Sequence, residues 1–153
     1  MIYSRSAEYA IRAFVHLADV PPGKYAMVKN IAEECEIPTH FLAKILQQMA
    51  RKGFLRSSKG PTGGFSLRRA AEEINLLELV DAIDGLSEYQ RCPGGMAECN
   101  DEAQCGMHDA WKGLRSRILD YLEETSIADV AAAQKLKREA VARKKRGRKT
   151  AKS

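Results

Sequence analysis

The chain has 153 residues, a length that fits one domain with short appendages. Hydrophobic residues make up 44% of it, enough for a packed core, and no apolar run approaches the roughly 18 residues of a membrane span. Charged residues Arg5, Glu8 and Arg12 interrupt the first segment, so it is not a secretory signal. We therefore expect a soluble, cytoplasmic protein, without membrane association, whose thiols stay reduced.

The net charge of +5 is unevenly distributed along the chain. From Gln134 to Ser153 there are ten lysines and arginines against one acid, Glu139, which leaves the first 133 residues at −4. We expect residues 134–153 to form a disordered basic tail. Such a tail either contacts phosphates without reading sequence or only keeps the terminus soluble.

The segment from Pro38 to Ala71 contains no acidic residue and several basic ones. A basic, acid-free segment in an otherwise acidic body is typical of a surface that binds a polyanion.

Three helices are expected in the first third of the chain. Apolar residues at helical spacing predict helices over 6–20 and 28–35, and Pro38 opens a third helix that ends at Gly53. The side chains that this third helix should bury are Phe41, Leu42, Ile45, Leu46 and Met49. Its other face carries short or hydrogen-bonding side chains, as a helix in the DNA major groove requires: Thr39, His40, Ala43, Lys44, Gln47 and Arg51.

The residues from Phe54 to Arg69 predict a β-hairpin around the turn sequence KGPTGG. Arg56 and Lys59 precede this turn and should contact the DNA backbone or minor groove. A helix pair followed by a basic hairpin makes a winged helix-turn-helix, a mainly helical fold with a small β-hairpin wing. We assign residues 1–85 to this DNA-binding domain.

The second half of the chain is expected to hold a loop and a long helix. Asn75 and Glu78 form a capping-box pattern ahead of LLELVDAID, and a cysteine-rich loop covers residues 86–107. An amphipathic helix begins at His108, in a region that we extend to residue 133. A regulator that reads the DNA groove usually binds two half-sites as a dimer. We therefore expect the protein to be a homodimer that pairs through this C-terminal helix.

The cysteine loop raises the question of which chemistry its side chains serve. Cys92, Cys99, Cys105 and His108 lie within seventeen residues of one another, and reduced thiols favour metal or redox chemistry over a structural disulfide. Three thiolates and an imidazole can hold tetrahedral zinc, but the gaps of six and five residues exceed the usual two to four. Spacing alone leaves a zinc ion, an iron–sulfur cluster and a thiol switch open.

Several of these segments together resemble the Rrf family of bacterial regulators, which includes an iron–sulfur cluster regulator and a nitric-oxide-sensing repressor. The resemblance rests on SAEYAIRAFVHLA, IAEECEIPTHFLAKILQQMARKGFLRSSKGPTGGFSL, LVDAIDG and the three-cysteine loop before a tryptophan-bearing helix, over about Met1 to Val130. It implies a dimeric winged-helix protein that binds a double-stranded DNA operator, with an iron–sulfur cluster that modulates operator affinity.

The resemblance also implies roles for individual residues. Cys92, Cys99 and Cys105 match the three cluster cysteines of the family in order. His108 matches the non-cysteine ligand of the iron–sulfur regulator, and Glu8 matches a carboxylate ligand that other members supply from the partner subunit. A two-iron [2Fe-2S] cluster would suit His108 and a four-iron [4Fe-4S] cluster would suit Glu8.

Together with this resemblance, the sequence predicts a cluster-sensing transcriptional regulator. It does not predict an enzyme, because it contains no nucleophile–base pair, paired carboxylates or nucleotide-binding loop. Two alternatives remain open. One is a zinc- or thiol-based DNA-binding regulator without a cluster, and the other is a non-specific nucleic-acid-binding protein that depends on its basic tail.

Overall fold

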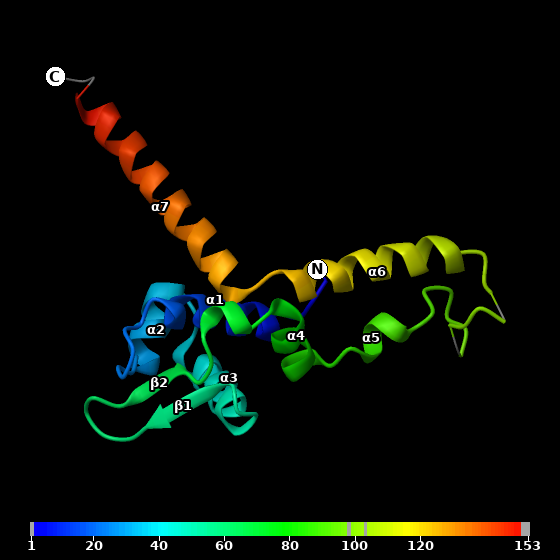
Figure 1. The fold of residues 1–153 in the computed structure, drawn as a ribbon, viewed down its shortest axis with the longest axis horizontal. Coiled ribbons are helices and arrows are strands. Elements are labelled where there is room, and N and C mark those ends of the chain that lie inside the picture. Colours follow the sequence, from blue (N-terminus) through cyan, green and yellow to red (C-terminus); the bar gives the residue numbers. More distant parts are fainter. Residues whose placement is uncertain (1, 98, 103, 151–153) are drawn as a thin grey trace.

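The computed structural model describes residues 2–97, 99–102 and 104–150. A body of short helices and one hairpin carries two long helices that extend from it in different directions (Figure 1). No helix in the described part of the chain combines the length and hydropathy of a membrane-spanning segment. The elements in chain order are α1 (Arg5–Ala18), α2 (Val28–Cys35), α3 (Thr39–Arg51), β1 (Leu55–Ser58), β2 (Gly64–Leu67), η1 (Ala71–Glu73), α4 (Leu76–Asp84), α5 (Ser87–Gln90), α6 (His108–Glu124) and α7 (Ile127–Thr150).

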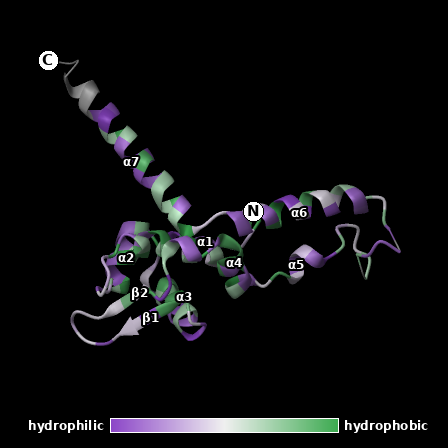
Figure 2. Ribbon diagram, in the orientation of Figure 1, coloured by the Kyte–Doolittle hydropathy of each residue, from purple (hydrophilic) through white to green (hydrophobic). Residues whose placement is uncertain are grey.

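Helix α1 lies at the centre of the body and packs against α2, α3, α4 and α7. It begins one residue earlier than expected because Ser4 caps it, accepting a hydrogen bond from the Ala7 backbone N–H at 3.1 Å. The Ser4 backbone N–H also donates to the Asp84 carboxylate at 2.8 Å. The start of α1 is thereby attached to the end of α4, and hydrophobic residues gather where these helices meet (Figure 2).

The turn between α2 and α3 sets the angle of the helix pair. Glu36 takes a left-handed φ of 54°, and the Ile37 backbone N–H donates to the Ala32 carbonyl at 2.9 Å. The Ile37 side chain is buried, and Pro38 directly precedes α3. The expected helix-turn-helix is confirmed.

The wing is a two-stranded antiparallel hairpin in which Leu55 pairs with Leu67 and Ser58 pairs with Gly64. A backbone bridge between Ala26 and Phe65 holds the hairpin against the segment before α2. Gly64 makes this approach possible, because a Cβ there would lie 2.1 Å from the Ala26 carbonyl oxygen and its φ is +141°. The predicted hairpin wing is confirmed.

Helix α4 begins at the predicted capping box. The Asn75 side chain accepts from the Glu78 backbone N–H at 2.9 Å, and the Glu78 carboxylate accepts from the Asn75 backbone N–H at 3.2 Å. Two further backbone bonds cross at this point, from Leu76 N–H to the Thr125 carbonyl at 2.9 Å and from Ile127 N–H to the Ile74 carbonyl at 2.8 Å. The start of α4 is therefore bonded to the junction between α6 and α7.

Helix α7 differs from the disordered tail expected over residues 134–153. It continues as a helix through Thr150, and residues 151–153 lie outside the described part of the chain. The physical reason is composition: alanine, lysine, arginine, glutamine and glutamate dominate this segment, and all are strong helix formers. The domain boundaries at residues 85, 107 and 133 remain predictions.

Replacing Asn75 by Ala should lower the free energy of unfolding by about 1 kcal/mol, because the backbone N–H of Glu78 loses its acceptor. Urea unfolding followed by circular dichroism measures the change. Asn30→Ala is the matched control, since Asn30 is exposed within α2 and should change stability by less than about 0.5 kcal/mol. An equal loss in both variants would contradict the role of the cap.

Candidate functional site

The outer face of α3 carries the side chains predicted to read DNA. Leu42, Ile45, Leu46 and Met49 follow the i, i+3, i+4 and i+7 pattern and are all buried. The predicted DNA-contacting side chains of this helix are all exposed: Thr39, His40, Lys44, Gln47 and Arg51. One face of α3 is therefore fixed in the core while the other is free to enter a groove.

Phe41 was predicted to be buried, and that prediction is wrong. Its side chain is 52% exposed and its ring lies against His40, with ring centroids 4.2 Å apart. The inward stripe of α3 begins with Leu42, and the preceding position on a helix points about 100° away from it. Phe41 therefore belongs to the outer face, beside the predicted DNA-contacting residues.

Helix α3 is supported from behind by the end of α4. The side-chain amide of Gln48 and the ammonium of Lys52 both donate to the Ala82 carbonyl, at 3.2 and 2.6 Å. The carbonyl is thus shared by Gln48, in the last turn of α3, and by Lys52, which directly follows this helix. This contact fixes α3 to α4.

The basic side chains of the hairpin divide into two groups. Arg56 and Lys59 are exposed on the wing and available to a phosphate backbone. Arg69 instead pairs with the Glu78 carboxylate at 2.9 Å, and its guanidinium lies 5.6 Å from the centre of the Phe54 ring. Arg69 therefore holds the hairpin against α4, a role that the count of basic residues did not reveal.

The cysteine loop lies between α5 and α6, beyond the end of α6 that is farther from the body (Figure 1). The Sγ atoms of Cys92 and Cys105 are 3.5 Å apart, and the Sγ of Cys99 lies 3.6 Å from Nδ1 of His108. All four cysteines of the chain are free thiols. The structure thus brings the three loop cysteines and His108 together in two close pairs.

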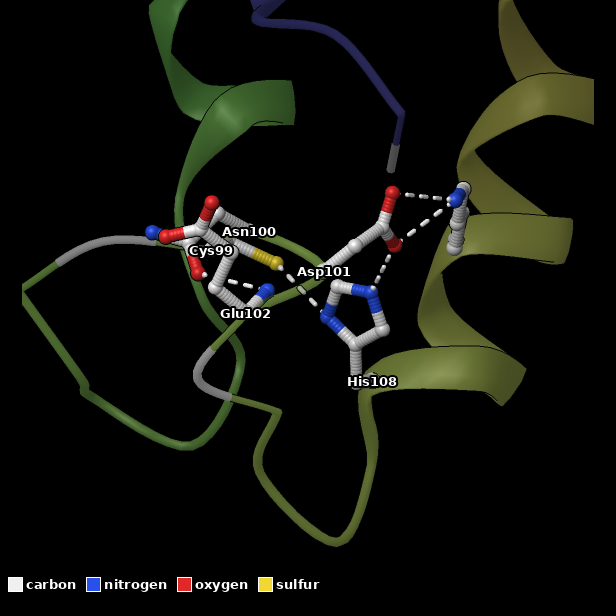
Figure 3. A network of polar contacts seen from close by, with 6 residues as sticks. Cys99, Asn100, Asp101, Glu102 and His108 are labelled. Carbon is white, nitrogen blue, oxygen red and sulfur yellow. Dashed lines mark hydrogen bonds and ion pairs between the residues drawn. The ribbon is translucent and has the colours of Figure 1, made fainter.

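His108 is the first residue of α6 and is only 3% exposed. Its Nε2 lies 2.9 Å from the Asp101 carboxylate, which also receives Lys112 at 2.8 and 3.0 Å (Figure 3). Hydrogen bonds from Lys112 and then from His108 lower the pKa of Asp101, so this carboxylate is ionised and accepts. Nε2 therefore donates its hydrogen to this carboxylate, and in the neutral imidazole the lone pair of Nδ1 then faces Cys99.

Asp101 is the residue of this site that sequence reasoning missed. It looked like one of several solvated acids in an acidic loop. A signal was available in Lys112, which follows His108 by four residues and so lies on the same face of α6. A carboxylate that reaches His108 and Lys112 together closes the loop onto the start of that helix.

The thiol of Cys92 has its own electrostatic environment. Hydrogen bonds from the backbone N–H groups of Met96 and Gly94, with further ones from Cys105 and Cys99, lower the pKa of Cys92. Over the residues that the structure describes, no group of three or more histidine, cysteine, aspartate or glutamate side chains is arranged to hold a metal ion.

Glu8, the other candidate ligand, lies elsewhere in the chain. It is on α1, where its carboxylate pairs with Arg12 at 3.4 Å. The cysteine loop extends away from the body that contains α1 (Figure 1). Within one chain, the fold places His108 beside the cysteines and leaves Glu8 on the body.

Comparison with known proteins settles the family. The model of the Rrf2 family, described as an iron-dependent transcriptional regulator, matches residues 3–133. The chain belongs to the Rrf2 family. Relatives in this family include a helix-turn-helix-type transcriptional regulator of Aquifex aeolicus, 32% identical over 85% of this chain and 91% of that protein. Another, from Mycobacterium tuberculosis, is 34% identical over 86% of this chain and 81% of its own length.

Solved Rrf2-like structures share the fold. CymR of B. subtilis, described as the global cysteine regulator, superposes with a TM-score of 0.71 at 19% identity, over 85% of this chain and 95% of that one. IscR of T. potens gives a TM-score of 0.69 at 18% identity, over 86% of both chains. The protein is thus a DNA-binding transcriptional regulator with the winged-helix fold of the Rrf2 family, and not an enzyme.

In protein prepared free of metal, Cys92 should react with iodoacetamide at neutral pH faster than Cys35. Hydrogen bonding lowers the pKa of Cys92, whereas burial raises the pKa of Cys35, and the thiolate is the reacting form. Mass spectrometry of timed samples measures both rates. The two cysteines should react alike in urea, and an equal rate in the folded protein would contradict the environment described for Cys92.

Proposed function

We propose that this regulator holds an iron–sulfur cluster on Cys92, Cys99 and Cys105, and that cluster occupancy changes its affinity for a DNA operator. The observation that carries the proposal is the orientation of His108. Its Nε2 is bonded to Asp101 and its Nδ1 faces Cys99, as in histidine ligands whose second nitrogen is held by a carboxylate. Thiolates and imidazole are also the donor types that hold such clusters.

Each residue of this site has a task in the proposal. The cysteines bind as thiolates, and the backbone N–H groups of Met96 and Gly94 favour that form at Cys92. Asp101 fixes the tautomer and orientation of His108, and Lys112 holds Asp101. A bound cluster supplies a centre that is sensitive to iron supply, oxidants or nitric oxide.

The proposal places the regulator on its operator as a homodimer in the cytoplasm. Leu114 and Tyr121 lie seven residues apart on α6 and are 54% and 50% exposed, an apolar stripe that a second copy would cover. Two copies would present two α3 helices to two half-sites. Glu8 of one copy could then reach the cluster of the other, while His108 serves its own loop.

A thiol switch is the second candidate function, and one distance favours it. The Sγ atoms of Cys92 and Cys105 are 3.5 Å apart, so a small movement would allow them to form a disulfide. A zinc site on the same four side chains is the other version of this regulator without a cluster. Metal content and colour separate these candidates from the cluster.

Protein purified without air should be brown or red and should contain iron and acid-labile sulfide in equal amounts, because thiolate-to-iron charge transfer absorbs visible light and zinc does not. His108→Ala should alter the visible spectrum and shorten the lifetime of the cluster in air. His16→Ala is the matched control, since His16 lies on α1 and pairs with Glu34. Glu8→Ala tests ligation across the dimer.

A colourless preparation with stoichiometric zinc would overturn the cluster proposal, and a colourless metal-free protein with a Cys92–Cys105 disulfide after mild oxidation would support the thiol switch. If neither His108→Ala nor Glu8→Ala changes the spectrum or lifetime, both ligand assignments are wrong. Cys35→Ser should leave the colour unchanged, because Cys35 lies on α2.

DNA reading should separate into base contacts and phosphate contacts. Gln47→Ala should cost about 1–3 kcal/mol on an operator selected from random duplexes and should relax its sequence preference. Lys59→Ala should weaken operator and random duplexes equally, since a phosphate contact carries no sequence information. Fluorescence anisotropy over a salt series measures both. Equal losses on the two duplexes for Gln47→Ala would contradict the role of α3, and loss of all preference at high salt would favour binding through the tail.

A further inference from the structure

We propose that the outer part of α7, residues 135–150 (the basic arm), binds a second segment of double-stranded DNA while α3 and the wing hold the operator. The regulator would then bridge two DNA segments. The inference uses the DNA binding of the family and is independent of the cluster.

The start of α7, at Ile127, is held against the body by hydrogen bonds and packing. The Ser126 hydroxyl accepts from the Asp129 backbone N–H at 3.1 Å, and the Asp129 carboxylate accepts from the Ser126 backbone N–H at 2.9 Å. Ile127 is fully buried, and its backbone N–H donates to the Ile74 carbonyl at 2.8 Å. The first turns of α7 also pack on α1 and η1, so the body determines the direction of the helix.

From Lys135 onward, most side chains of α7 are charged. Every side chain from Lys135 to Lys145 is exposed. Over this stretch the single acid Glu139 stands among six basic residues: Lys135, Lys137, Arg138, Arg143, Lys144 and Lys145. The sequence continues with Arg146, Arg148 and Lys149. A helix of this composition attracts phosphates from any sequence.

The apolar surface of the arm is too small and too scattered for a protein groove. Its large exposed apolar side chains in the described part are Leu136 and Val141, which are 67% and 47% exposed. They are five positions apart in the sequence, so on a helix they point about 140° away from each other and form no single stripe. Docking into a groove needs apolar anchors at i, i+3, i+4 and i+7, and a polyanion does not.

The direction of the arm decides which DNA it meets. In Figure 1 α7 leaves the body on the side opposite the hairpin and α3, and its end lies far from both. Sixteen helical residues reach about 24 Å from the body. A duplex held by α3 and the wing therefore lies on one side of the molecule, and the arm points to DNA on the other.

The test uses the full chain, with most of the positive charge of the arm removed. The six described basic residues of the arm are changed together to glutamine, which keeps a high helix propensity. A matched control exchanges lysine and arginine at the same six positions and so keeps the charge. Operator duplex is fixed on beads, protein is added, and retention of a labelled duplex of unrelated sequence is measured. A labelled double-stranded RNA is offered in a parallel sample.

The unchanged chain and the charge-preserving control should retain the labelled DNA on the beads. The glutamine variant should retain at least tenfold less of it. Operator affinity of the glutamine variant should stay within about threefold of the unchanged chain. The slope of log retention against log salt should be no steeper than about −8 per arm, since the arm carries nine basic residues and each phosphate contact contributes about −0.9.

Three results would overturn the proposal. Equal retention by the glutamine variant would show that the arm does not hold the second duplex. A loss of operator affinity as large as the loss of retention would mean that the arm contacts the flank of the same duplex. Preferential retention of RNA would assign the arm to a different partner.

Discussion

The structure depends on one short backbone crossing. Leu76 and Thr125 share a hydrogen bond, Ile127 and Ile74 share another, and Asn75 and Ser126 lie between them as an isolated bridge. At this crossing the start of α4 meets the end of α6 and the start of α7. Since buried backbone groups must find partners, these two bonds hold three helices in a fixed relation. The directions of the cysteine loop and of α7 both follow from it.

The same crossing joins the cysteine loop and the outer face of α3 through α4. One end of α4 is bonded to the α6–α7 junction. Near its other end, the Ala82 carbonyl accepts hydrogen bonds from Gln48 of α3 and from Lys52, which follows that helix. Helix α6 packs against α4, and its first residue, His108, lies beside Cys99 of the cysteine loop. Packed helices and shared hydrogen bonds therefore connect the cysteine loop with α3, a physical route by which a change at one could bias the other.

Local patterns allowed much of this to be predicted from the sequence. The helix pair, the hairpin and the capping box at Asn75 each depend on residues within a few positions of one another, and the structure confirms them. Phe41 was wrongly assigned to the core because it is hydrophobic, although its position does not fit the helical repeat. The buried stripe from Leu42 to Met49 is complete without it. The tail was misjudged because charge suggested disorder although its residues favour helix.

The candidate site was predictable in its residue types but not in its arrangement. The spacing of the cysteines and His108 indicated that they belong together, and the structure brings them into pairs. The spacing could not say that Asp101 would turn towards His108, because that contact depends on how an irregular loop folds onto α6. Nor could the basic character of the segment 38–71 indicate that Arg69 pairs with Glu78 and lies over the ring of Phe54.

The glycine at position 64 has a consequence for how such regulators can diverge. The atoms that a side chain would strike there belong to the backbone of Ala26 and Met27, so no rotamer change can relieve the clash. Natural variation should therefore keep the wing at a constant distance from the body, while exposed positions such as Lys44 and Gln47 remain free to change. A duplicated gene could acquire a new operator through a few outward-facing codons of α3 and inherit the spacing of its DNA contacts unaltered.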